Sequence, residues 1–224
     1  MRSEDGPRER QPIFNAPPAT LWTCGVLVAI YLLLNLVGPG LQSWLLTNFA
    51  FISELFQAQF ATPGIGIRPL VMSSLVTHGL IHLELGHMVL NTGFLLAFGS
   101  FVERRHGALG FLLLFAGSAA AGALTELAFI GSRQFFLIGA SGAVYGMMGA
   151  FVATMAVKGR FARSTALNFV MIVLVLNLVL AMLGVSDFLA NEAQVAWRAH
   201  IGGLVAGLII AFVLQRLGRP ASRR

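Results

Sequence analysis

The amino-acid sequence predicts an all-α polytopic membrane protein. Of its 224 residues, 57% are hydrophobic and only 11% are charged, which is too little charge for the surface of a soluble domain of this size. The mean hydropathy is +0.80. The apolar residues gather in stretches of roughly 17–25 residues, the length of helix that spans a hydrocarbon core about 30 Å thick. We therefore expect a bundle of membrane-spanning helices.

Six stretches are apolar enough to be spans. Residues 1–20 before them are polar and proline-bearing, and we expect a flexible cytosolic tail there. The predicted spans cover 21–46, 82–102, 107–130, 138–157, 166–184 and 199–217, and Gly38-Pro39-Gly40 breaks the first near its far end. Residues 47–76 are too polar to span and too apolar for a solvated linker, so we expect them in the membrane interface. The transmembrane domain then covers 21–217, and 218–224 form a basic tail.

The positive charges predict the orientation of these spans. Twelve of the 15 Lys and Arg residues fall in the tails and connections of one side, and only Arg68, Arg133 and Arg198 fall on the other. By the positive-inside rule, both termini are cytosolic. The basic residues form no continuous patch, which argues against nucleic-acid binding. The first apolar stretch is too long for a cleavable signal, and the acidic residues of the tail argue against a mitochondrial transit peptide. We expect a bacterial inner (cell) membrane protein.

Polar residues lie near the starts of spans two, four and six, which all run from the outside to the inside. They are His82, His87, Asn91, Ser141 and His200. Counting back from the cytosolic charges at 1.5 Å per residue places Asn91, Ser141 and His200 roughly 20–26 Å from that side. All three are therefore expected at similar depth, below the outer face.

Two rows of small residues at four-residue intervals offer a reason for Ser141 and His200 to meet. One row is Gly142, Gly146 and Ala150; the other is Ala199, Gly203, Gly207 and Ala211. Such rows let helix backbones approach closely in lipid. Each row is one position away from Ser141 or His200, so packing of the two spans would bring hydroxyl and imidazole within reach. Alternatively, both rows are ordinary packing faces.

A serine next to a histidine predicts nucleophilic chemistry, because the imidazole can take the proton of the hydroxyl. No acidic residue lies at this depth in spans four or six, so we expect a dyad of Ser141 and His200. Tyr145, one turn after Ser141, either orients His200 or only fills the bundle. His87 and Asn91 share one helix face and could stabilise an oxyanion with the backbone N–H of Ser141, or could be interhelical hydrogen-bond glue.

Metal binding is not expected. His78 and His82 are four residues apart, but no carboxylate or cysteine completes a site, and the His-Glu-x-x-His pattern is absent. Cys24, the only cysteine, is expected to be a packing residue. Glu103 either anchors the topology together with its neighbouring arginines or bonds nearby backbone.

These motifs together resemble the rhomboid family of intramembrane serine proteases. The resemblance covers most of the chain from His78 to Gly207. It rests on His82, His87 and Asn91, on Glu103-x-Arg105, on Gly139-x-Ser141-Gly142 with Tyr145, and on Ala199-His200-x-Gly202-Gly203. It implies a six-helix rhomboid-like bundle of the compact bacterial type, with Ser141 as nucleophile and His200 as general base. It also implies support from His87, Asn91, Gly139 and Tyr145, and no cofactor.

The resemblance further implies substrates that are single-span membrane proteins, cut near the outer end of their helix. One departure is Ser73-Ser74, where many members carry Trp-Arg in the first loop; this concerns loop geometry and gating. A lid formed by the stretch before His200, with Phe188 and Trp197, is a hypothesis. The alternatives are a catalytically silent rhomboid-fold protein that binds membrane helices and, with less support, a small transporter.

Overall fold

The computed structural model describes residues 16–61, 68–130, 134–157, 163–182 and 196–217. Residues 1–15 of the predicted N-terminal tail, the predicted tail 218–224 and Phe188 of the hypothetical lid lie outside these ranges. The first half of the chain forms α1 (Pro18–Leu36), α2 (Pro39–Phe49), β1 (Phe51–Ile52), α3 (Ser53–Ala61), α4 (Pro69–Thr77), the 3₁₀ turn η1 (His78–Leu80), α5 (Leu85–Phe94) and the π-helical turn η2 (Leu95–Gly99). The second half forms α6 (Ser100–Ile130), β2 (Phe136–Leu137), α7 (Ser141–Val157), α8 (Arg163–Met182) and α10 (Trp197–Leu217).

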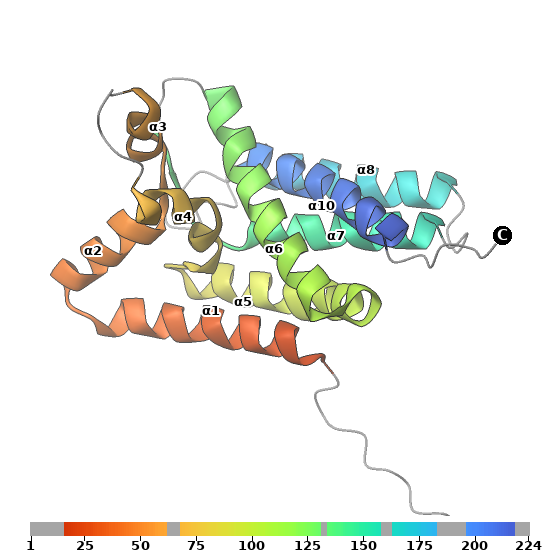
Figure 1. Ribbon diagram of the computed structural model, residues 1–224, viewed down its shortest axis with the longest axis horizontal. Helices are drawn as coiled ribbons and strands as arrows, with labels where there is room; N and C mark the ends of the chain where they lie inside the picture. Colours follow the sequence, from red (N-terminus) through yellow and green to blue (C-terminus); the bar gives the residue numbers. More distant parts are fainter. Residues whose placement is uncertain (1–15, 62–67, 131–133, 158–162, 183–195, 218–224) are drawn as a thin grey trace, which may run out of the picture.

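Three helical stretches of the described residues are long and apolar enough to cross a membrane. They are Pro18–Leu36, the 45-residue stretch Leu85–Phe129 and Trp197–Leu217. The second is interrupted at Gly107, whose φ of 75° and ψ of 173° are not helical, so the chain changes direction inside α6 (Figure 1). The apolar part of α7, Ser141–Ala156, is shorter. The predicted all-α membrane architecture is confirmed.

The first helix begins slightly earlier than the sequence indicates and ends at the predicted break. The predicted tail extends to residue 20, but α1 starts at Pro18, a residue type favoured at the first helical position. Glu103 of α6 accepts hydrogen bonds from the backbone N–H groups of Ala19 (2.9 Å) and Thr20 (2.6 Å). These N–H groups have no acceptor within their own helix. At the far end, the predicted break at Gly38-Pro39-Gly40 is present: α1 ends at Leu36 and α2 starts at Pro39. The predicted stretch 21–46 therefore consists of the 19-residue helix α1 followed by α2.

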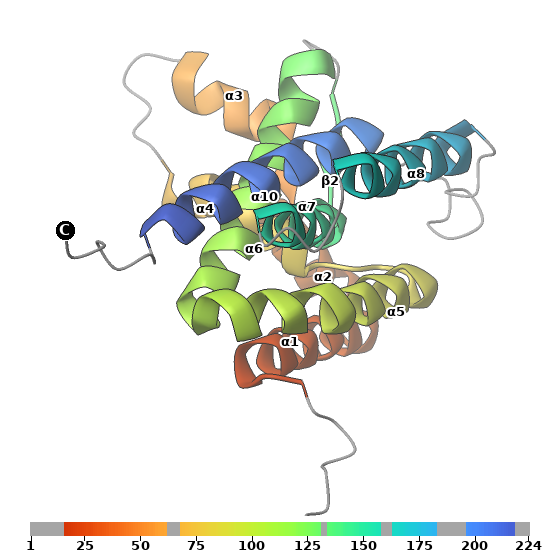
Figure 2. The ribbon, with the colours of Figure 1, turned by 90° about the vertical axis from the view of Figure 1, so that its right-hand side faces the viewer.

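Helices α6, α7 and α10 form the centre of the protein. Helices α7 and α10 lie side by side (Figures 1 and 2). Their backbones touch at glycines of the two small-residue rows. A Cβ atom at Gly203 would meet the carbonyl oxygen of Gly142, and one at Gly207 would meet that of Gly146. The predicted close approach of these two segments is therefore observed.

The segment between α1 and α5 folds against the loop that leads into α7. Phe51 of β1 pairs with Leu137 of β2 in a two-residue antiparallel bridge. The Phe51 side chain is fully buried and packs against the rings of Phe56 and Phe135. The bridge and this aromatic cluster hold the end of the loop, which fixes where α7 begins.

Candidate active site

Ser141 is the first residue of α7, and a tight turn places it there. Gly139, two residues earlier, has a φ of 105°, a conformation that strains residues with a side chain. Its N–H donates a 3.0 Å hydrogen bond to the carbonyl of His78, which ties the turn to η1. The first N–H groups of a helix lack intrahelical acceptors. The turn therefore presents the Ser141 hydroxyl next to a set of backbone donors.

The structure brings Ser141 and His200 together. His200 lies in the first turn of α10, and its Nε2 is 2.8 Å from the Oγ of Ser141, a hydrogen-bond distance. The two residues come from helices whose backbones touch at Gly142 and Gly203, one turn or less away. Only 9% of His200 is exposed, whereas Ser141 is half-buried. A hydroxyl and a buried imidazole held in contact form a nucleophile–base arrangement.

Tyr145 covers the other side of the histidine ring. Its ring stacks on that of His200, with 4.3 Å between centroids and 6° between the planes. Of the two sequence-based interpretations, contact with His200 is the one that this geometry matches. The stacking leaves the imidazole little freedom to rotate away from Ser141.

His82 organises the turn before Ser141, a role that sequence reasoning missed. Its Nε2 accepts hydrogen bonds from the side-chain amide of Asn91 at 3.0 Å and from the backbone N–H of Ala140 at 3.2 Å. Because both partners donate N–H groups, the proton of the neutral ring lies on Nδ1. The sequence signal was present in the polar residues of span two, but the partner Ala140 is 58 residues away.

His87 lies against the same turn. A Cβ atom added at Gly139 would fall within 2.8 Å of the Nε2 of His87, so the turn and the ring are in close contact. The rings of His82 and His87 meet edge to face at 4.9 Å. His87 therefore contacts the turn before Ser141 directly. Asn91 is linked to the same turn through its hydrogen bond with His82.

The two histidines considered for a metal have separate partners. His78 Nδ1 bonds the carbonyl of Ser74 at 2.7 Å, while His82 bonds Ala140 and Asn91. Burial lowers the pKa of His78 to about 4, and the ring is neutral at physiological pH. In the ranges that the structure describes, no three His, Cys, Asp or Glu side chains converge on one point.

Fold and site together define a helical membrane protein that holds a serine–histidine pair between two of its helices. A family model for the rhomboid domain matches residues 70–217, which is more than half of the sequence. The chain therefore belongs to the rhomboid family and is an integral membrane protein.

Curated relatives include both proteases and an inactive protein. The chain is 29% identical over 147 residues to the rhomboid protease GluP of Bacillus subtilis, covering 65% of this chain and 26% of the relative. It is 27% identical over 198 residues to the rhomboid protease GlpG of Yersinia enterocolitica (88% and 63%). It is 23% identical over 206 residues to the inactive rhomboid-related protein 2 of Caenorhabditis elegans (92% and 56%). The chain spans less than two thirds of the length of each of these relatives.

Proposed function

We propose that this chain is an intramembrane serine endopeptidase with Ser141 as nucleophile and His200 as general base. The observation that carries the proposal is the 2.8 Å contact between His200 Nε2 and Ser141 Oγ. A serine alcohol attacks a peptide carbonyl only when a neighbouring base accepts its proton. Membership of a family that includes intramembrane proteases supports the same reaction class.

The reaction proceeds in two stages. Ser141 Oγ bonds to the substrate carbonyl carbon while its proton passes to His200 Nε2, and the imidazolium then gives that proton to the leaving amine as the C–N bond breaks. This leaves an acyl ester on Ser141. A water molecule, deprotonated by His200, then hydrolyses the ester and regenerates the serine. Tyr145 keeps the ring in place during both stages.

The negative charge that develops on the carbonyl oxygen needs hydrogen-bond donors. We assign this role to the backbone N–H of Ser141 at the start of α7 together with the side chains of His87 and Asn91. The contacts of His87 with Gly139 and of Asn91 with His82 support the assignment, because they hold both side chains beside the turn before Ser141.

We further propose six spans with both termini cytosolic and the site opening outward, in a bacterial inner membrane. The turn at Gly107 supports the count, since it divides the 45-residue stretch into two spans. The excess of Lys and Arg on one side supports the orientation. Substrates are then single-span membrane proteins, cut near the outer end of their helix.

Cleavage of a reporter transmembrane substrate in liposomes tests the proposal. Wild type should cleave, and Ser141→Ala and His200→Ala should each lose at least about 10³-fold in rate. Ser43→Ala is the matched control, because Ser43 is exposed on α2. Equal cleavage by wild type and Ser141→Ala would overturn the assignment.

A silent helix-binding protein is the second candidate, and the inactive relative favours it. It predicts that wild type and Ser141→Ala both capture the reporter by crosslinking and that neither cleaves it. The transport alternative has less support, because Glu103 and Glu126, the two buried carboxylates of α6, bond backbone N–H groups of other helices.

A further inference from the structure

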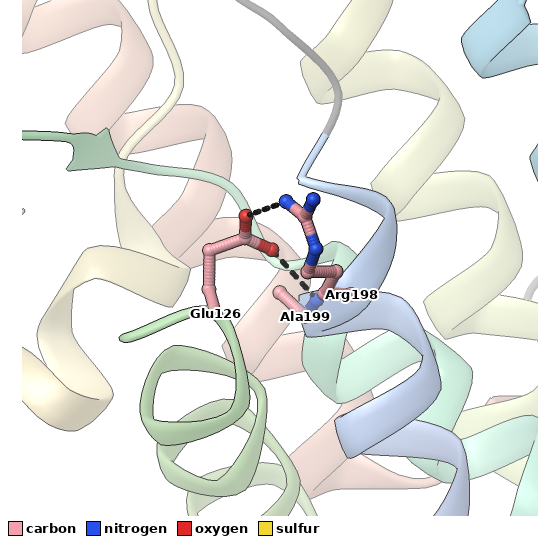
Figure 3. Close-up of polar contacts among 3 residues, drawn as sticks. All are labelled: Glu126, Arg198 and Ala199. Carbon is pink, nitrogen blue, oxygen red and sulfur yellow. Dashed lines mark hydrogen bonds and ion pairs between the residues drawn. The ribbon is translucent and has the colours of Figure 1, made fainter. Parts of the chain in front are cut away.

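Glu126 is a buried carboxylate that touches the residue next to the proposed base. It lies near the end of α6, and only 3% of it is exposed. Its Oε2 accepts a 3.1 Å hydrogen bond from the backbone N–H of Ala199, and its Oε1 is 3.2 Å from Nη1 of Arg198 (Figure 3). Neither contact belongs to the serine–histidine pair.

The contact with Glu126 gives the Ala199 N–H, at the start of α10, a hydrogen-bond acceptor that its own helix does not provide. Ala199 is the third residue of α10, and its N–H has no intrahelical acceptor. On the other side of this residue, the carbonyl oxygen faces Gly122, one turn before Glu126 on α6. A Cβ atom at Gly122 would come within 2.8 Å of that oxygen. One face of α6 therefore holds Ala199 at both its N–H and its carbonyl group.

We propose that Glu126 is a positioning residue for His200, which acts through the backbone of α10 instead of through the imidazole. By fixing Ala199, the carboxylate sets the register of α10 against α6 and so sets the distance from His200 to Ser141. Arg198, whose guanidinium also lies 4.7 Å from the centroid of the Trp197 ring, holds the carboxylate in its orientation. This inference rests on the proposed function of Ser141 and His200.

Glu103 provides a matched control on the same helix. It too is buried, 6% exposed, and it too accepts backbone N–H bonds at a helix start, but that helix is α1. Loss of either carboxylate removes a helix cap and lowers stability. Only the loss of Glu126 should move His200.

The experiment compares Glu126→Leu, Glu126→Gln, Glu103→Leu and Glu103→Gln in the full chain, reconstituted in liposomes. The readouts are the labelling rate of Ser141 by a fluorophosphonate, kcat and KM on the reporter substrate, and hydrogen exchange in the first turn of α10. Glu126→Leu should lower labelling and kcat by about tenfold or more, because a small misplacement of a catalytic group has effects of this size. Its KM should stay within about twofold, since the substrate-binding surface is unchanged.

The conservative variant should rescue the function. The amide oxygen of Glu126→Gln can still accept the Ala199 N–H, so its labelling rate should stay within about threefold of wild type. Glu103→Leu and Glu103→Gln should lower the melting temperature while folded molecules label at the wild-type rate. A wild-type labelling rate in folded Glu126→Leu, or an equal loss in Glu103→Leu, overturns the proposal.

Two provisions keep the test decisive. If Glu126→Leu does not fold, Arg198→Gln replaces it, because Arg198 holds the carboxylate. The rate of hydrogen exchange in the first turn of α10 should then rise about threefold relative to Glu103→Gln. An unchanged exchange rate overturns the proposal. If wild type is neither labelled nor active, the proposed function fails, and hydrogen exchange alone then decides whether Glu126 fixes the start of α10.

Discussion

The ring of Tyr145 lies parallel to the imidazole of His200, with 4.3 Å between their centroids. Tyr145 follows Ser141 by one turn of α7, so one helix supplies both the hydroxyl and the surface on which the imidazole rests. In a Ser-His-Asp triad, a carboxylate orients the imidazole. Here the ring of Tyr145 lies flat against the imidazole instead. The nearest comparable carboxylate contact is that of Glu126, which binds the backbone N–H of the neighbouring residue Ala199.

Removing the ring at position 145 should therefore slow the reaction more than removing its hydroxyl. Stacked aromatic pairs contribute about 0.5–1.5 kcal/mol beyond area burial, which corresponds to a rate loss of up to about tenfold for Tyr145→Ala. Tyr145→Phe keeps the ring and should retain most of the activity. Single-turnover cleavage of the reporter measures both variants, and equal losses in the two would contradict an orienting role of the ring.

The proposed oxyanion donors should affect catalysis rather than substrate binding. His87→Ala and Asn91→Ala should each lower kcat by about 10²-fold with little change in KM, since their hydrogen bonds strengthen only in the transition state. Steady-state kinetics with the reporter provide the measurement. A rise in KM at constant kcat would instead place these side chains in substrate binding.

The contact between α7 and α10 should not tolerate a single added methyl group. In Gly203→Ala the new Cβ atom meets the carbonyl oxygen of Gly142, and the helices must separate. We expect a loss of about 1–3 kcal/mol in the free energy of unfolding and slower labelling of Ser141. Gly93→Ala, where nothing lies within 4 Å, serves as the control and should be at least as stable as wild type. Thermal melts in detergent would show the difference, and matching melting temperatures would argue against tight backbone packing.

A side chain at Gly139 would be disfavoured both by the backbone conformation and by a steric clash. Gly107 shares only the first of these two effects, so a comparison of the two positions separates them. Both glycines have positive φ values, but an added Cβ atom meets nothing within 4 Å at Gly107 and meets the His87 ring at Gly139. Gly107→Ala and Gly139→Ala should each cost about 1–3 kcal/mol from strain. Only Gly139→Ala should also slow labelling of Ser141 by displacing His87. If Gly107→Ala slows labelling equally, the effect is one of general stability.

Local patterns made much of the fold predictable. Apolar length gave the helices, Gly38-Pro39-Gly40 gave the end of α1, and the two small-residue rows gave the contact that joins Ser141 to His200. These features depend on residues close together in the sequence or on a repeat that can be counted.

The remaining features depend on partners far apart in the sequence. The hydrogen bonds at the start of α1 involve Glu103, which lies 84 residues after Ala19. The role of His82 requires Ala140, and that of Glu126 requires Ala199, 73 residues later. No local pattern specifies which backbone N–H a buried carboxylate or imidazole will meet. Such contacts become visible only once α5, α6, α7 and α10 are placed.

The contacts of the two carboxylates of α6 also determine whether the number of membrane crossings is even or odd. Glu103 binds the first turn of α1, whereas Glu126, near the opposite end of α6, binds the first turn of α10. The two helices therefore start at opposite ends of the bundle, and α10 finishes at the end where α1 begins (Figure 1). If this fold crosses a bilayer, the chain passes through it an even number of times between Pro18 and Leu217.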